Sequence, residues 1–252
     1  ILSQYDPLIG AAVVILLAIL VFLLSRKKAV KQAGAVFRML PGVKKLVHAI
    51  GLAVEDGTRL HVSLGSGSLI DPSCPSGLTG LAALDRIGQL TSTSDLPPMS
   101  TSGSGGFQIL SQDVISQYAA ATNTRDRMDA TLAQLAGVTS FSYAAGTIEA
   151  IRDSGTSANV LMGDFGAEAG LLCEGAERLN TYTLAGSNSV IGQSVFMALS
   201  KDALIGEEIY ALPAYLGVKA THQASLRVQD IFRLLIILLM IGGAILKVMN
   251  II

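Results

Sequence analysis

The sequence of 252 residues has no tryptophan, two cysteines, three histidines and only 15% charged residues. The cysteines, Cys74 and Cys173, lie far apart, and neither belongs to the C-x-x-C spacing of a zinc or redox site. No H-E-x-x-H or G-x-S-x-G arrangement occurs, so the signatures of a zinc hydrolase and of a serine nucleophile elbow are missing. The sequence therefore identifies no metal site, no cofactor and no catalytic residue.

Because charge is scarce, half of the residues are hydrophobic and the mean hydropathy is +0.53, which is high for a soluble domain. The apolar residues concentrate at the two ends. The first run, Leu8 to Leu24, is uncharged and almost wholly aliphatic, and a bilayer core of about 30 Å needs about 17 to 25 such residues in a helix. Basic residues follow the run instead of preceding it, unlike a cleaved signal peptide. Residues 1–25 are therefore predicted to form an uncleaved transmembrane anchor.

The second apolar run, Ile231 to Ile252, is interrupted only near its ends, by Arg233 and Lys247. Long basic side chains at such positions can reach the lipid headgroups. One alternative is a buried C-terminal helix of a soluble domain, but the apolar residues cover every face of the helix and not one stripe. This pattern favours a second transmembrane helix within residues 225–252.

A basic segment, residues 26–46, follows the first run. Seven basic residues and no acidic one lie in it, namely Arg26, Lys27, Lys28, Lys31, Arg38, Lys44 and Lys45. By the positive-inside rule, this predicts a two-pass protein of the cytoplasmic membrane whose intervening domain faces the cytoplasm. The segment either lies along the anionic inner leaflet of the lipid bilayer or simply continues the membrane helix into solvent.

The rest of the chain is acidic. From Leu46 onward it has 11 basic and 18 acidic residues, a net charge of about −7. A surface that binds nucleic acid should be basic, so nucleic acid is not an expected partner.

Strand-like and helix-like segments alternate through residues 47–224. Strands are expected at residues 59–64, 99–101, 138–143, 158–163 and 181–186. Helices are expected between them, including a polar helix at 125–136 and a mostly helical stretch, kinked by Pro213, at 194–217. This alternation predicts an α/β domain with three layers and a largely parallel sheet, flanked by the N- and C-terminal transmembrane helices.

Glycine-rich turns follow several of the expected strands. In a parallel sheet such turns gather at the carboxyl edge, where helix N-termini favour anions, so they could bind a phosphate-bearing small molecule. The candidate residues are Gly65, Ser66, Gly67, Asp71, Gly103, Gly105, Gly163, Asp164, Gly186 and Glu207. However, the third glycine of a G-x-G-x-x-G fingerprint would fall at Ile70, and no Walker lysine follows any turn. The alternative is that the glycines only permit tight strand-to-helix turns.

Three segments carry a family resemblance: "LHVSLGSG", "NVLMGDFGAEAGLL" and "LIGEEIYALPAYLG", in that order. Together they resemble an uncharacterised family of bacterial membrane proteins that have a hydrophobic anchor and an α/β domain of unknown function. The resemblance covers about Val47 to Val218. It implies the domain boundary but assigns no activity and no catalytic residue.

Two functional hypotheses remain open. The first is a structural or scaffold role, in which membrane-anchored copies assemble into a homo-oligomer through weakly charged faces and small residues. The second is a ligand-binding or enzymatic domain that uses the glycine turns together with Asp71, Asp164 and Glu207. Low charge and the lack of a catalytic signature favour the first.

Overall fold

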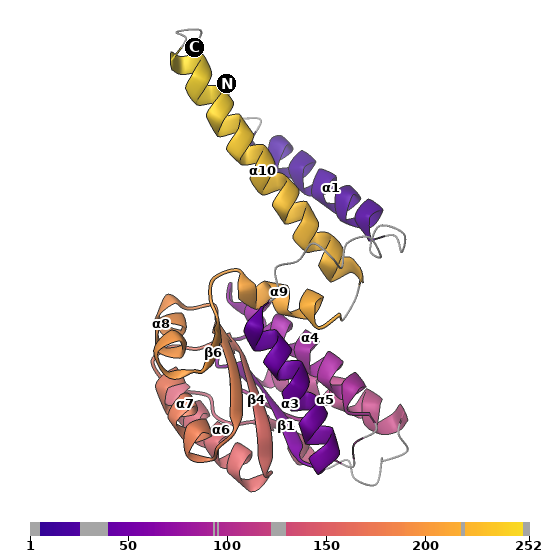
Figure 1. Ribbon diagram of the computed structural model, residues 1–252, viewed down its shortest axis with the longest axis vertical. Helices are drawn as coiled ribbons and strands as arrows, with labels where there is room; N and C mark the ends of the chain where they lie inside the picture. The colour runs from indigo at the N-terminus through magenta and orange to yellow at the C-terminus, as the bar shows by residue number, and fades with distance from the viewer. Residues whose placement is uncertain are drawn as a thin grey trace. The chain divides into compact units, whose positions relative to one another are not determined.

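A computed structural model of the chain describes residues 6–25, 40–92, 94, 96–121, 130–217 and 220–248 (Figure 1). It divides into two compact units: residues 39–218, and residues 1–38 together with 219–252. Most of the basic segment predicted at 26–46 lies outside the described residues.

The larger unit is built on a six-stranded sheet in which every strand pairing is parallel, with the order β3-β2-β1-β4-β5-β6. The strands are β1 (Arg59–Gly65), β2 (Met99–Ser102), β3 (Ala133–Leu135), β4 (Thr156–Asp164), β5 (Tyr182–Ser187) and β6 (Asp202–Leu204). This is the order of the doubly wound dinucleotide-binding folds, in which the direction of winding reverses between β1 and β4. The predicted α/β class with a parallel sheet is confirmed.

Helices cover both faces of this sheet (Figure 1). One core lies beneath α3 (Pro41–Asp56), α4 (Cys74–Leu90), α5 (Gly105–Ala121) and α9 (Glu208–Tyr215), and the other lies beneath α6 (Ser140–Asp153), α7 (Ala169–Arg178) and α8 (Val190–Leu199). Neighbouring side chains of one strand enter different cores: Val160 of β4 packs in the first and Leu161 in the second. A parallel sheet buried on both faces is the expected result of these crossovers.

The third strand lies earlier in the chain than the sequence pattern predicted. A short 3-10 helix (Ala130–Leu132) leads directly into β3, and residues 138–143, expected as a strand, contain the start of α6. Thr139 and Ser142 form a capping box at that helix start, in which each side chain bonds the other residue's backbone N–H. This cap explains why a helix, and not a strand, begins there. The helix predicted at 125–136 is wrong at residues 133–135, which form β3. Residues 122–129 lie outside the described part of the chain.

The stretch from 194 to 217 was also expected to be mostly helical, but β6 interrupts it. The strand has only three residues, between α8 and α9, and it is held by parallel pairing of its residues with Leu184 to Gly186 of β5. Such short edge strands have little signal of their own and depend on their neighbour in the sheet.

The smaller unit contains two apolar helices, α1 (Asp6–Leu24) and α10 (Ala220–Val248). Within the described residues, the segment Thr221–Val248 of α10 is the one helix long and apolar enough to cross a membrane by length and composition. The apolar part of α1, Gly10–Leu24, is shorter than the roughly 20 residues that a 30 Å hydrocarbon core requires. The predicted N-terminal span is therefore not supported by the described helix.

Candidate functional site

The carboxyl edge of the sheet between β1 and β4 is where a doubly wound fold usually binds its ligand. The chain leaves β1 toward α4, which covers one face of the sheet, and leaves β4 toward α7, which covers the other. Several of the candidate glycines lie at this point, because β1 ends at Gly65 and β4 ends at Asp164.

The backbones of the two strand ends are in direct contact there. Gly65 has a φ of +78°, and a Cβ on it would lie 2.5 Å from the Asp164 nitrogen. A Cβ on Gly163 would overlap the Leu64 carbonyl oxygen and lie 2.7 Å from the Gly65 nitrogen. The Ser66 N–H donates to the Asp164 carbonyl at 3.0 Å, so pairing continues beyond the strands. These glycines are required by close backbone approach at the edge of the sheet.

In the adjoining loops, carboxylates of the chain itself accept hydrogen bonds from backbone N–H groups. The buried Glu168 side chain accepts a hydrogen bond from the Gly166 N–H at 2.8 Å, immediately before α7. In the loop after β1, Asp71 accepts from the Ser68 N–H at 3.1 Å. Pro75, in the first turn of α4, has no N–H to offer. The loop N–H groups that could bind an anion therefore already bond a carboxylate of the chain, and this negative charge disfavours the binding of a phosphate.

The structure brings some of the predicted site residues together and separates others. The residues in mutual contact at the switch point are Gly65, Ser66, Gly67, Gly103, Gly163 and Asp164. Gly186 instead faces Met162 and Ile209 in the core, and Gly105 has open space around it. Glu207 is exposed just before α9, and Asp71 bonds within its own loop. A ligand site at these turns stays a prediction.

Two further polar residues lie at this edge that the sequence pattern did not suggest. The Tyr210 hydroxyl, on α9, donates to the Asn188 side-chain oxygen at 2.7 Å, just after β5. Partial burial raises the pKa of Tyr210, and the negative charge of Asp164 raises it further. No local motif marks this group, because it is assembled from β4, the end of β5 and α9.

A buried polar network lies on the α6 side of the sheet. The His61 Nδ1 bonds the Asn159 side-chain oxygen at 2.6 Å, which makes Nδ1 the donor and leaves Nε2 to accept from Thr101 at 2.9 Å. Thr147 of α6 donates onward to Thr101 at 3.2 Å. Burial lowers the pKa of His61 to about 4, so the ring is neutral at pH 7. The network joins three central strands to one helix. The buried Asn159 Nδ2 has no partner among the described residues.

Tyr143 of α6 joins the same region to the end of β1. Its buried hydroxyl bonds the Ser63 hydroxyl and accepts from the Gly65 N–H at 3.2 Å. Burial raises the pKa of Tyr143, so the hydroxyl stays protonated at neutral pH. The alternating polar residues of β1, His61 and Ser63, were the available signal for this network. In the structure these side chains face α6 and not solvent, although the alternation alone is equally typical of a strand with one exposed face.

Replacing Tyr143 with phenylalanine is expected to lower the free energy of unfolding by about 1–3 kcal/mol, because the Gly65 N–H would be left buried without its acceptor. Tyr210→Phe is the matched control, since its hydroxyl is in an exposed bond and its loss should cost about 0.5 kcal/mol or less. Denaturant unfolding of both variants measures the difference. Equal losses of unfolding free energy in the two variants would show that the buried Tyr143 hydroxyl stabilises the fold no more than the exposed Tyr210 hydroxyl.

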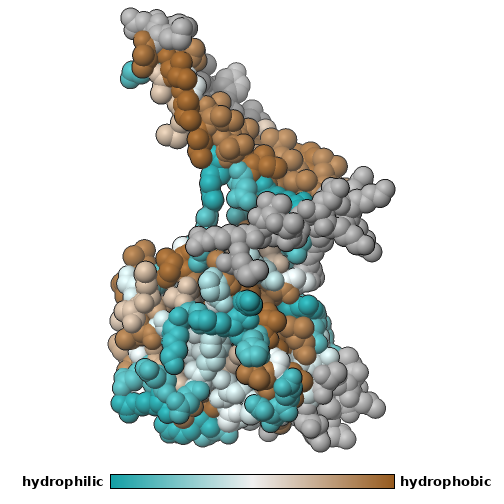
Figure 2. Space-filling model, in the orientation of Figure 1, coloured by the Kyte–Doolittle hydropathy of each residue, from teal (hydrophilic) through white to brown (hydrophobic). Residues whose placement is uncertain are grey.

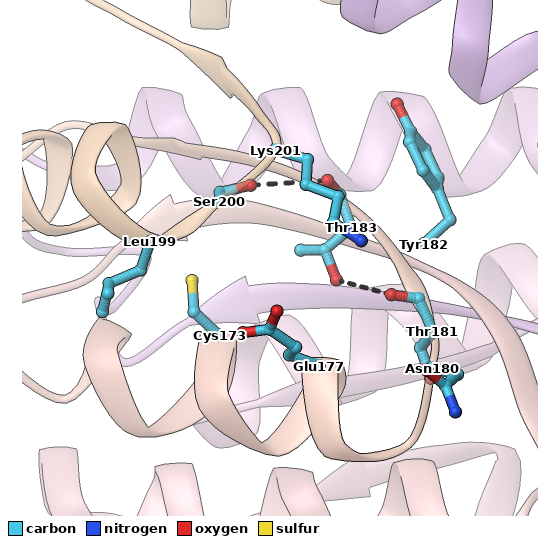
Figure 3. Close-up of a pocket in the computed structure, with 9 residues that line it drawn as sticks. All are labelled: Cys173, Glu177, Asn180, Thr181, Tyr182, Thr183, Leu199, Ser200 and Lys201. Carbon is cyan, nitrogen blue, oxygen red and sulfur yellow. Dashed lines mark hydrogen bonds between the residues drawn. The ribbon is translucent and has the colours of Figure 1, made fainter.

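A cavity of about 340 Å³ lies at the opposite, amino edge of β5 and β6 (Figure 3). Its lining residues are Cys173, Glu177, Asn180, Thr181, Tyr182, Thr183, Leu199, Ser200 and Lys201. Ser200 donates to the Thr183 carbonyl across it at 3.4 Å. Burial, with a contribution from Glu177, raises the pKa of the Cys173 thiol to about 11, so it is a poor nucleophile at neutral pH. No group of His, Cys, Asp or Glu in the described part of the chain could hold a metal ion.

Large hydrophobic side chains are exposed on the layer formed by α6, α7 and α8. They are Val138 and Phe141 around the start of α6, Leu171 of α7, and Val190, Ile191, Met197 and Leu199 of α8. Figure 2 shows hydrophobic surface over α8. Apolar side chains are also exposed on the other layer, namely Val47, Leu52, Leu78, Leu90 and Ile109. What distinguishes α8 is that Val190, Ile191 and Met197 lie together on one helix without charge, and grouped apolar side chains are typical of a surface that contacts another molecule.

Comparison with known proteins gives one family. The family model described as "Domain of unknown function (DUF6754)" matches residues 5–252, almost the entire chain. No curated protein and no solved structure matches. The resemblance to an uncharacterised family is thereby confirmed.

Proposed function

The chain belongs to the DUF6754 family, and we propose that it is a membrane-anchored structural protein whose α/β domain assembles into a homo-oligomer. The anchor is α10. The second pass of this proposal rests on the uncharged sequence run Leu8 to Leu24 and not on the described helix α1, whose apolar part is shorter. The basic residues that follow α1 favour a domain on the cytoplasmic side of the membrane.

The observation that carries this proposal is the contrast between the two surfaces of the domain. At the switch point, where a ligand would be expected, the backbones of β1 and β4 are in contact, and carboxylates accept hydrogen bonds from N–H groups of the loops. On the α6, α7 and α8 layer, large apolar side chains are exposed to solvent. The first surface lacks the positive charge that a phosphate requires, while the second has the character of a protein interface.

A second candidate function is binding of a small molecule at the carboxyl edge. It is favoured by the convergence of Asp164, Asn188 and Tyr210 there, since a few polar groups on different elements are typical of ligand sites. An acid, an amide and a phenol suit a ligand with hydroxyl or amine donors better than a phosphate.

Two copies of the full chain with different affinity tags provide the test of assembly. When both are produced in one cell and extracted in mild detergent, capture of one tag is expected to recover the other. Mixing two separately extracted preparations is the control for association after extraction. Failure of the co-produced copies to purify together would contradict the proposal.

A further inference from the structure

Helix α8 has apolar side chains on both its buried and its exposed face, although only one face is covered by the domain. Phe196 is fully buried against α6 and α7 residues, and Gly192 packs on the loop after β4. On the other side, Val190, Ile191 and Met197 are 77%, 61% and 71% exposed. These three positions, with Ser194 between them, recur at helical spacing and form one outward stripe. An apolar stripe on a helix normally faces a packing partner.

The charge of the domain limits what can cover this stripe. Residues 39–218 contain nine basic and seventeen acidic residues, a net charge of −8. The 22 residues from Leu179 to Ser200, which include all of α8, contain no charged residue. Because the domain is acidic overall, like charge opposes the association of two copies in general, whereas a contact between two α8 helices adds no charge to that repulsion.

We propose that the outward stripe of α8 pairs with the same stripe of a second copy, with the two helices antiparallel about a two-fold axis. This deepens the proposed function and rests on it. A two-fold contact of this kind uses the same patch twice, so the number of subunits in the assembly is even.

The antiparallel arrangement also brings the two ends of α8 together. A helix of ten residues is about 15 Å long. Val190 and Ile191, at its start, therefore lie opposite the end of α8 in the second copy. At that end Leu199 is exposed and borders the cavity of about 340 Å³. Val190 and Ile191 of one copy would therefore meet the exposed Leu199 of the other, so apolar side chains face apolar side chains at both ends of the contact.

Disulfide formation in native membranes tests the pairing in the full chain. Ser194, exposed in the middle of α8, lies near the two-fold axis, so Ser194→Cys in a Cys74→Ser background is expected to give a covalent dimer on oxidation. Gln112→Cys, on exposed α5 across the sheet, is the matched control. The dimer yield for Ser194→Cys should exceed the control by at least about tenfold, because pairing raises the local thiol concentration. Equal yields would overturn the proposal.

A charge on the stripe gives an independent readout. Ile191→Glu is expected to halve the mass of the assembly, whereas Ile109→Glu, on α5 with a similar exposure of 68%, should leave it unchanged. A single cooperative melting transition in Ile191→Glu, as in Ile109→Glu, shows that the domain is still folded, although its midpoint falls when assembly is lost. If Ile191→Glu keeps the mass of the wild-type assembly, pairing through α8 is overturned while assembly itself stands. A wild-type mass that includes a different protein would also overturn pairing of α8 with itself. A monomeric wild type would instead contradict the proposed function itself.

Discussion

Replacing Gly163 with alanine is expected to lower the free energy of unfolding by about 3 kcal/mol or more, or to prevent folding. The added Cβ would overlap the Leu64 carbonyl oxygen and lie 2.7 Å from the Gly65 nitrogen. These are backbone atoms of two central strands, so they cannot move aside as the end of a flexible side chain can. Denaturant unfolding of the extracted protein measures the loss.

Gly105→Ala is the matched control for this substitution. Gly105 also belongs to the predicted set of ligand-binding glycines, but it begins α5 with no atom within 4 Å of an added Cβ. Its replacement should leave stability unchanged or raise it by up to about 1 kcal/mol, since alanine favours helix. Similar effects of the two substitutions would contradict the view that Gly163 is required by close strand contact.

The α/β domain is expected to lose about 3 kcal/mol of stability as the pH falls from 6.5 to 4. Burial lowers the pKa of His61 from 6.5 to about 4, while its bond to Asn159 opposes that shift. In this window the unfolded chain binds a proton that the folded chain excludes, so stability is full above pH 6.5 and falls as the pH drops. Below pH 4 both states are protonated and the contribution of His61 no longer changes. Denaturant unfolding at a series of pH values measures the slope.

His61→Leu separates this effect from the titration of other groups. The variant is expected to be less stable at pH 7, because Asn159 and Thr101 lose a buried partner, yet its stability should change less between pH 6.5 and 4. An unchanged slope in His61→Leu would contradict the assignment.

Parts of the fold with strong local patterns were predictable from the sequence. The apolar run "ANVLMG" predicts a buried strand and lies within β4, and Gly57, with a φ of +64°, ends α3 where the pattern stops. By contrast, β3 (Ala-Gln-Leu) and β6 (Asp-Ala-Leu) have little intrinsic preference for a strand. They become strands by pairing with β2 and β5, which are distant in sequence.

The candidate site was predictable only in its location. The sequence correctly placed Gly65 and Gly163 at strand ends, but their role depends on how closely β1 and β4 approach, which no local pattern contains. The contact of Tyr210 with Asn188 and the network around His61 also join distant segments. A polar residue in a central strand looks the same in the sequence whether it faces solvent or a buried partner.

Native mass spectrometry of the chain extracted in mild detergent tests the central claim, homo-oligomeric assembly, most directly. It measures the number of subunits and any retained small molecule together. The predicted result is an even multiple of the 26.2 kDa subunit mass without a bound small molecule. A single subunit that carries an additional small-molecule mass would contradict assembly and favour a ligand site beside Asp164, Asn188 and Tyr210.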